Sequence, residues 1–550
     1  MAEIILIQPY TGSWDEMSVR FPESLLAVAA VPVAKGYDVK IIDQRVSSNF
    51  YRELNDSVGS ETVIFGVTAI TGEQIQFAID VTKYLKKTFP NIPVCWGGVH
   101  MTLLPEQTMD YPLIDYGIVG DGDYVFNKLF ERLRDNKPVD DLGGLIYKNE
   151  FNDVKSNVGQ LNVRETKKGN KYNRENGATD ILTDLDLLPP LPYDLVDIGK
   201  YRVFNNRSMN SATLNTSRGC YWRCKFCSSP VVSEGIWRGL SAKHVLEKVD
   251  ELYHKYQIRM IYFQDDYFPG PKKRFIEILE GLSKYKRKLM WSTLGVRADT
   301  LSQFSDDEWD LLYDSGCHSL DIGIESGNER IIKLMNKAET LEQMRSANKK
   351  LADYDFKVKY SFIIGFPGET EDEISDTMNF AAELENTNPN CYTLIFTFRP
   401  IIGTAFYAES LQQGFPEPKS LEEWASMDFD NWGKSYCEYW VTQKLAKRLR
   451  AINFVSYFHN KNVKYKFGGS KLLRFAFNIY HPIARFRFKH NFYNYCFEVH
   501  FKDLVLSAKN IIRKFRDDSR KFRDDSRKVK LSITANKTLT KTPFEYRARP

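Results

Sequence analysis

Apolar and polar residues alternate along the first part of the chain as expected of strands followed by helices. The apolar runs with the length of strands are residues 2–9, 38–44, 61–71, 92–98 and 116–123. The run at 61–71 is apolar almost throughout, which is typical of a strand buried on both faces. Residues 21–37 and 72–90 are predicted to be helices, the second with an apolar stripe. We predict a doubly wound, Rossmann-like parallel sheet over residues 1–145, with ligands at the carboxyl ends of its strands.

A second series of strands begins near Ser211. The expected strands are residues 212–217, 260–266, 289–296, 318–325, 359–366 and 391–398, and the helices expected between them include 241–256, 271–285 and 369–385. Six such repeats exceed one nucleotide-binding fold but fall short of the eight of a closed barrel. We therefore predict a partial (β/α)6 barrel over residues 206–412. Residues 146–205 read as a connector, because a polar stretch at 167–177 precedes a proline-rich one at 185–195 that favours extended chain.

Beyond residue 412 the alternation stops. Residues 413–550 are predicted to form a mostly helical, aromatic and basic region. Its heptapeptide KFRDDSR occurs at 514–520 and again at 521–527, which indicates a duplication in a polar helix or disordered arm. From Val441 onward there are 27 Lys and Arg and 7 Asp and Glu, or +20, which leaves −15 for the first 440 residues of a chain whose net charge is +5.

The composition of the 550 residues fits a globular protein of three to five domains. No apolar run approaches the ~18 residues of a membrane span. Glu3 stands where a signal peptide carries basic residues, so we do not expect export. A cytoplasmic protein would keep its eight cysteines reduced. Five of them are isolated among apolar residues and are predicted to be small buried side chains: Cys95, Cys317, Cys391, Cys437 and Cys496.

The other three cysteines form a C-x3-C-x2-C loop directly after a predicted strand. Cys220, Cys224 and Cys227 can converge on an iron–sulfur cluster, with one iron left without a protein ligand. A structural zinc site would need a fourth ligand. The nearest further candidate, His244, lies inside a predicted helix. An iron–sulfur cluster therefore explains the spacing best.

This loop, with Phe226 before its last cysteine, resembles the cluster motif of the radical S-adenosylmethionine (radical SAM) superfamily. The resemblance implies a [4Fe–4S] cluster whose open iron binds the amino and carboxylate groups of S-adenosylmethionine. An electron from a donor such as flavodoxin or ferredoxin would then release a 5′-deoxyadenosyl radical.

Residues at four later strand ends agree with this resemblance. Asp265 and Asp266 match the family's contact to the methionine amino group, Glu325 and Ser326 its ribose or methionine contact, and Gly365 and Pro367 its adenine turn. Arg297 closes the third barrel strand, and Pro400, Gly403 and Thr404 resemble a motif after the sixth. Any one of these could be a helix cap or a surface charge, but barrel active sites collect at the carboxyl ends of strands.

The N-terminal domain resembles the cobalamin-binding domains that precede radical SAM barrels. Its strand ends carry the small residues Thr68, Ala69, Gly97, Gly98, Gly120 and Gly122. Such residues let a flat macrocycle approach the backbone, although glycines also form ordinary tight turns. The sequence has no D-x-H-x-x-G motif, so cobalt is not expected to be held by that histidine. His100 is expected to be a loop or tail contact of the cofactor. The G-E-G-E of related proteins is Gly120-Asp121-Gly122-Asp123 here, with shorter carboxylates.

In residues 461–490, basic residues alternate with aromatic and aliphatic ones. The pattern is compatible with a helical cap over the open barrel or with peripheral contact at a membrane surface, which suits a lipid substrate. No nucleic-acid-binding motif accompanies the charge, so nucleic acid is not the expected partner.

The sequence favours a cobalamin-dependent radical SAM enzyme that methylates an unactivated carbon of a small molecule or lipid. By analogy, the radical would remove a substrate hydrogen and the substrate radical would take a methyl group from methylcobalamin. The alternatives are an oxidative cyclase or rearrangement enzyme of the anaerobic tetrapyrrole cyclase type, and a corrinoid or cluster sensor without turnover.

Overall fold

A computed structural model describes residues 1–12, 15, 18–148, 154–156, 160–166, 169–175, 182–201, 210–427, 436–463, 471–493, 496, 497 and 499. Residues Met1–Phe492 form one compact unit and Tyr493–Pro550 a second. All contacts below belong to the first unit. The KFRDDSR repeat lies outside the described residues.

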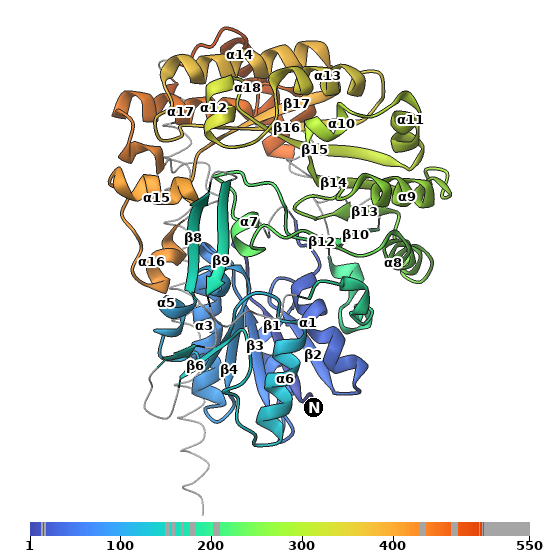
Figure 1. Ribbon diagram of the computed structural model, residues 1–550, viewed down its shortest axis with the longest axis vertical. Coiled ribbons are helices and arrows are strands. Elements are labelled where there is room, and N and C mark those ends of the chain that lie inside the picture. The colour runs from blue at the N-terminus through green and yellow to red at the C-terminus, as the bar shows by residue number, and fades with distance from the viewer. Residues whose placement is uncertain are drawn as a thin grey trace, which may run out of the picture. The chain divides into compact units, whose positions relative to one another are not determined.

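The N-terminal sheet contains the five parallel strands that the sequence predicts (Figure 1). They are β1 (Ile4–Gln8), β2 (Val39–Asp43), β3 (Ile64–Thr68), β4 (Val94–Gly97) and β5 (Tyr116–Ile118). Their order, β2-β1-β3-β4-β5, reverses direction at β1, as in doubly wound folds. The sheet then extends past the predicted boundary through two antiparallel strands, β6 (Leu145–Lys148) and β7 (Val154–Ser156).

Helices cover both faces of this sheet. They are α1 (Glu23–Ala34), α2 (Phe50–Ser57), α3 (Glu73–Thr88), α4 (Val99–Leu103), α5 (Pro105–Met109) and α6 (Asp123–Arg134). Ile5 and Phe65 pack into one core with Ile75 and Ala78 of α3. Coverage on both faces explains why β1 and β3 are apolar without alternation.

The connector holds more regular structure than its composition predicts. Strands β8 (Gln160–Thr166) and β9 (Gly169–Glu175) pair as an antiparallel hairpin. Three short 3-10 helices follow: η2 (Leu185–Leu187), η3 (Tyr193–Leu195) and η4 (Ile198–Lys200).

The second sheet is the predicted partial barrel. Its parallel strands, in both sequence and spatial order, are β10 (Ser211–Leu214), β13 (Met260–Phe263), β14 (Met290–Val296), β15 (Cys317–Glu325), β16 (Lys357–Ile364) and β17 (Cys391–Thr397). The helices along it are α7 (Ser229–Val232), α8 (Ala242–His254), α9 (Lys272–Ser283), α10 (Ala298–Leu301), α11 (Asp306–Asp314), α12 (Glu329–Leu334), α13 (Leu341–Leu351) and α14 (Glu371–Thr387). A two-stranded ribbon, β11 (Ser217–Arg218) with β12 (Arg238–Gly239), frames the loop after β10.

The region after the barrel is helical where it is described. Its elements are α15 (Ala405–Gln412), α16 (Leu421–Ser426), η5 (Tyr436–Tyr439), α17 (Gln443–Ser456) and α18 (Lys471–Lys489). Asn453 Nδ2 donates to Ile395 O at 2.6 Å, and Ile395 N donates to Ser456 Oγ at 3.2 Å. Helix α17 therefore satisfies backbone groups of the edge strand β17 that no further strand pairs with.

Helix α16 returns to the N-terminal domain. Trp424 is 1% exposed and packs in the same core as α3 and β3. Its indole donates to Gln107 Oε1 at 2.6 Å. Among the described residues, no helix is both long and apolar enough to cross a membrane.

Candidate functional site

The three-cysteine loop follows strand β10 at the carboxyl end of the barrel. Gly219 precedes Cys220 with a φ of +78°, and a Cβ there would stand 2.3 Å from Ile236 O. Only glycine fits this turn. Cys224 is buried, while Cys220 and Cys227 are partly exposed. Burial raises the pKa of Cys220 to about 11 and raises the pKa of Cys224 and Cys227.

Residues from later barrel loops hold this loop in place. Lys225 N donates to Met335 O at 2.9 Å, and Asn336 Nδ2 donates to Arg223 O at 2.9 Å. The Arg297 guanidinium lies 3.8 Å from the ring centroid of Trp222, inside the cysteine motif. The ring of Phe226 lies 6.1 Å from that of Phe366, next to Gly365. Arg297 and the turn at Gly365 thus lie against the cysteine loop.

The two aspartates after β13 have different surroundings. Asp265 is 2% exposed, and its Oδ1 accepts hydrogen bonds from Thr216 N and Oγ1 at 3.0 and 2.8 Å. Burial raises the pKa of Asp265 to about 6. Asp266 instead lines a cavity and accepts from Ser229 Oγ at 2.7 Å. Asp265 therefore shapes the start of the cysteine loop, and Asp266 faces open space.

A buried charge cluster lies beside the loop. Glu325 is 8% exposed and has a φ of +70°, a region that a non-glycine residue rarely adopts. Lys337 Nζ lies 3.8 Å from Glu325 Oε1 and 3.0 Å from Glu339 Oε2. Arg297 Nη2 donates to Lys337 O at 2.7 Å. Burial raises the pKa of Glu325 against the opposing effect of Lys337.

Other predicted contacts are engaged within the fold. Ser326 is fully buried, with its Oγ 3.0 Å from Thr377 Oγ1 of α14. Gly365 O accepts from Trp440 Nε1 at 2.9 Å, and Pro367 is buried in the same turn. Thr404 caps α15 by accepting from Tyr407 N at 3.1 Å.

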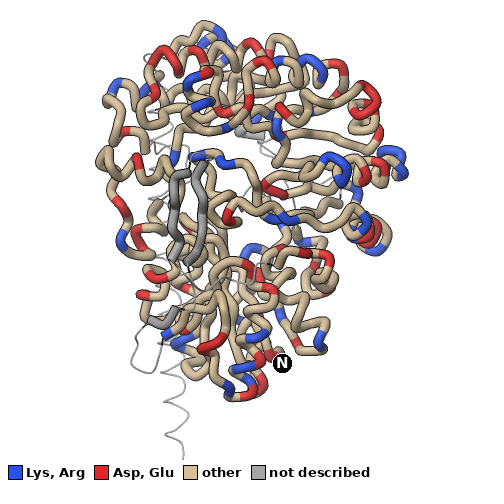
Figure 2. Tube along the Cα trace, in the orientation of Figure 1, with Lys and Arg blue, Asp and Glu red and all other residues tan. Residues whose placement is uncertain are grey.

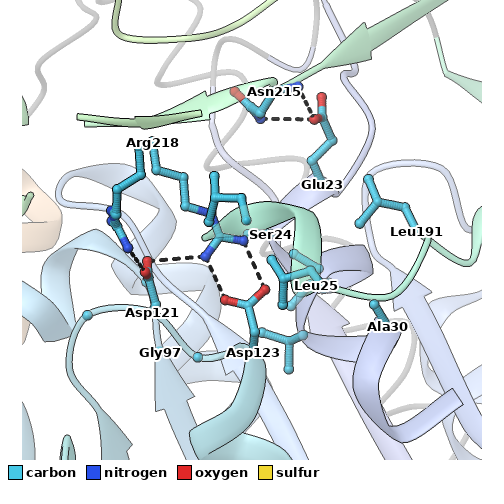
Figure 3. A pocket seen from close by; sticks show the side chains of 18 of the residues that line it. Glu23, Ser24, Leu25, Ala30, Gly97, Asp121, Asp123, Leu191, Asn215 and Arg218 are labelled. Carbon is cyan, nitrogen blue, oxygen red and sulfur yellow. Dashed lines mark hydrogen bonds and ion pairs between the residues drawn. The ribbon is translucent and has the colours of Figure 1, made fainter. Parts of the chain in front are cut away.

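A cavity of about 770 Å3 lies between the carboxyl ends of the two sheets (Figure 3). Its barrel wall includes Gly219, Ser229 and Asp266, which flank the cysteine loop. Its other wall includes the predicted small residues Thr68, Gly97, Gly98, Gly120 and Gly122. The apolar residues of the N-terminal domain that line the cavity include Leu6, Ala27, Ala30, Gly66 and Phe126.

His100, predicted to be a loop or tail contact of the cofactor, and Ala69, predicted to lie on its wall, do not line this cavity. Both are fully buried, and neither is a lining residue. His100 Nδ1 lies 3.0 Å from Thr71 Oγ1, and its ring lies 6.0 Å from that of Trp424. Burial lowers the pKa of His100 to about 4, so the imidazole is neutral at physiological pH.

Sequence reasoning noted Asp121 and Asp123, but it missed the arginines that pair with them and the second link between the two walls. Arg218 donates to Asp123 Oδ2 and Oδ1 at 2.6 and 2.9 Å, and it lies 3.3 Å from Asp121 Oδ1. Arg238 forms an ion pair with Asp121. On the other side, Glu23 Oε2 of α1 accepts from Asn215 N and Nδ2 at 2.7 and 2.9 Å (Figure 3). The available signals were Arg218, two residues before Cys220, and the two aspartates of the Gly120–Asp123 stretch, because opposite charges at facing sheet ends can pair.

The residues present fit the cofactors that the sequence resemblance implies. A Cβ on Gly97 would meet nothing within 4 Å, so this wall is open to a flat group. Gln264 Nε2, a buried donor without a hydrogen-bond partner, belongs to a residue of the cavity wall. Within the described part of the chain, no three His, Cys, Asp or Glu side chains are arranged to bind a single metal ion. A [4Fe–4S] cluster binds each cysteine to a different iron and does not require that arrangement.

Comparison with known proteins identifies both parts of the chain. The model of the radical SAM superfamily matches residues 214–381, and that of the B12 binding domain matches residues 21–130. The chain is 31% identical to the uncharacterized methyltransferase PH0819 of Pyrococcus horikoshii, over 70% of this chain and 78% of that protein. It belongs to the B12-binding radical SAM family.

Two further comparisons cover most of the chain. Cytidylyl-2-hydroxyethylphosphonate methyltransferase of Streptomyces wedmorensis is 23% identical, over 76% of this chain and 83% of that protein. The structure of the cobalamin-dependent S-adenosylmethionine radical enzyme OxsB superposes with a TM-score of 0.64 at 18% identity. That match covers 94% of this chain and 75% of OxsB, and it shows that the two proteins share a fold.

Proposed function

We propose that this B12-binding radical SAM protein is a methyltransferase that acts on an unactivated carbon. One observation carries the proposal: a single cavity is lined both by Gly219 and Ser229, which flank the cysteine loop, and by the glycine wall of the N-terminal sheet. A group bound at either wall therefore lies beside the same cavity. The methyltransferase names of two relatives agree with this reading.

When bound, the cluster with S-adenosylmethionine supplies a 5′-deoxyadenosyl radical, and cobalamin carries the methyl group. We assign Cys220, Cys224 and Cys227 as the cluster ligands. Gly97, Gly98, Gly120 and Gly122 leave room for the corrin ring, and Thr68 is one of the polar residues on that wall. The Arg218–Asp123 and Glu23–Asn215 links hold the walls at a fixed separation.

We assign Asp266, Arg297, Glu325 and the Gly365–Pro367 turn to S-adenosylmethionine, because they surround the cysteine loop. Asp265 and Ser326 are assigned positioning roles, since Asp265 Oδ1 and Ser326 Oγ form hydrogen bonds within the fold. His100 is not proposed as a cobalt ligand, because its ring packs beside Trp424. The substrate is a small molecule or lipid, and a flavodoxin- or ferredoxin-type protein supplies electrons.

The test uses anaerobically reconstituted, full-length protein with cobalamin, a reductant and S-adenosylmethionine that carries a deuterated methyl group. A methyltransferase forms 5′-deoxyadenosine and also S-adenosylhomocysteine. A cyclase or rearrangement enzyme forms the first product alone, and a sensor consumes no S-adenosylmethionine. The control is the variant with Cys220→Ala, Cys224→Ala and Cys227→Ala, which should form no 5′-deoxyadenosine. Absence of S-adenosylhomocysteine from active wild-type protein would exclude the methyltransferase.

A further inference from the structure

Helix α18 (Lys471–Lys489) presents large apolar side chains to solvent. Phe475, Ile479, Ile483 and Phe486 are 63%, 60%, 47% and 58% exposed. Their spacing of four, four and three residues places them on one face of the helix. No other helix in the described part of the chain carries more than one exposed large apolar residue. Such a contiguous stripe is typical of an interaction surface.

The opposite face of α18 is packed against the protein. Phe477, Ala484 and Phe488 are 1%, 0% and 6% exposed. The Phe488 ring stacks on His459 at 3.7 Å, and His481 Nδ1 lies 2.8 Å from Phe458 O. The helix is therefore anchored through one side, so the exposed stripe belongs to a fixed surface.

Basic residues accompany the stripe. At about 100° per residue, Arg485 and Lys489 fall between the exposed apolar face and the packed face. Both are exposed. Residues 461–497 contain 8 Lys and Arg and no Asp or Glu. In the barrel and the N-terminal domain, by contrast, acidic and basic residues are interspersed (Figure 2).

We propose that α18 docks this protein on a membrane surface that contains anionic lipids. The apolar stripe enters the boundary between headgroups and acyl chains, while the basic side chains reach the lipid phosphates. A second copy of the chain is disfavoured as the occupant, because a symmetric contact would bring two basic helices together. The helix lies on the surface, since it lacks the apolar length of a membrane span. This surface is separate from the proposed catalytic function.

The experiment is sedimentation of the full-length protein with phosphatidylcholine vesicles, with or without phosphatidylglycerol. We expect binding to the anionic vesicles that weakens as salt concentration rises. The variant Phe475→Ser, Ile479→Ser, Phe486→Ser should bind the anionic vesicles at least about tenfold more weakly than the wild type does. The variant Phe475→Leu, Ile479→Leu, Phe486→Leu should bind as the wild type does.

A second pair of variants tests the contribution of the basic side chains to vesicle binding. Arg485→Glu with Lys489→Glu should lose the preference for phosphatidylglycerol. Lys333→Glu with Lys349→Glu changes the net charge equally at exposed barrel positions and should retain it. Circular dichroism checks that each variant folds. The proposal is overturned if folded wild-type protein does not bind anionic vesicles at low salt, or if the serine variant binds equally well. It is also overturned if the serine variant dissociates a dimer while vesicle binding is absent.

Discussion

Arg218 donates two hydrogen bonds to the carboxylate of Asp123, at 2.6 and 2.9 Å, and so joins the cysteine loop to the N-terminal sheet. Asp123 is the first residue of α6, and Arg218 lies two residues before Cys220. Burial alone would raise the pKa of Asp123, but the guanidinium holds this pKa below its ordinary value. The pair fixes the distance between the two walls of the cavity.

Replacing Arg218 should destabilise the protein strongly. Arg218→Gln leaves the Asp123 side chain, which is 4% exposed, without its charged partner. The expected loss is about 2–4 kcal/mol in the free energy of unfolding, measured by urea denaturation. Arg345→Gln is the matched control, because Arg345 and Glu383 are 41% and 45% exposed and their pair contributes at most about 1 kcal/mol. Equal effects of the two substitutions would contradict the role given to Arg218.

Leucine at Gly97 should reduce corrinoid binding without unfolding the protein. The new side chain would extend into the cavity, where a Cβ meets nothing within 4 Å. Corrinoid retained after gel filtration, read from its absorbance, should fall well below the wild-type amount while the urea midpoint changes little. Gly199→Leu, at an exposed position, should leave both quantities unchanged. Full corrinoid retention by Gly97→Leu would exclude this wall as the binding surface.

Single cysteine substitutions should separate the cluster loop from the structural cysteines. Cys224→Ala should lower the iron and sulfide content after reconstitution, because each ligand of a [4Fe–4S] cluster holds a different iron. Cys391→Ala, at the start of β17, should leave both contents at the wild-type level. A full cluster in Cys224→Ala would contradict the ligand assignment.

The turn after β16 should make stability depend on pH through Glu369. Burial raises the pKa of Glu369 to about 8, although the carboxylate accepts from Phe366 N at 3.1 Å. Because the folded state holds this proton more tightly than the unfolded state does, stability falls as pH rises from about 4.5 to about 8. Glu369→Gln should remove this slope, which amounts to at most about 1.4 kcal/mol per pH unit.

Urea midpoints between pH 5 and pH 8 measure this effect. The gap between Glu369→Gln and wild type should widen in favour of the variant as pH rises. Glu373→Gln is the control, since hydrogen bonds from Arg330 lower the pKa of Glu373 to about 2 and it does not titrate in this range. Parallel profiles for wild type and Glu369→Gln would refute the prediction.

The sequence predicts the two parallel sheets well because their strands are apolar and separated by amphipathic helices. The β8–β9 hairpin is not predicted, because its polar sequence has no periodic pattern of apolar residues. The antiparallel strand β6 is also missed, because pairing direction depends on tertiary contacts. The position of α16 against α3 joins segments that are far apart in the chain, and no local pattern reveals it.

The candidate site is predictable to the level of its motifs. The cysteine spacing identifies the loop, and the glycines identify the opposite wall. Sequence alone does not show which of Asp265 and Asp266 is buried and which lines the cavity. The two adjacent side chains point in different directions, and the pattern does not say which one points inward. It also does not show that Asp121 and Asp123 pair with arginines of the barrel, since this depends on how the two sheets meet.

The Trp424 core contact has a consequence for biosynthesis. The N-terminal domain is translated first, yet its core includes Phe415, Leu421, Trp424 and Tyr436, which follow the whole barrel in the chain. During synthesis the N-terminal domain therefore exposes an apolar surface to solvent until those residues leave the ribosome and pack against it. A fragment that ends at residue 145 would keep that surface exposed permanently. The cobalamin-binding part is thus a domain by sequence family, but it completes its folding only together with the full enzyme.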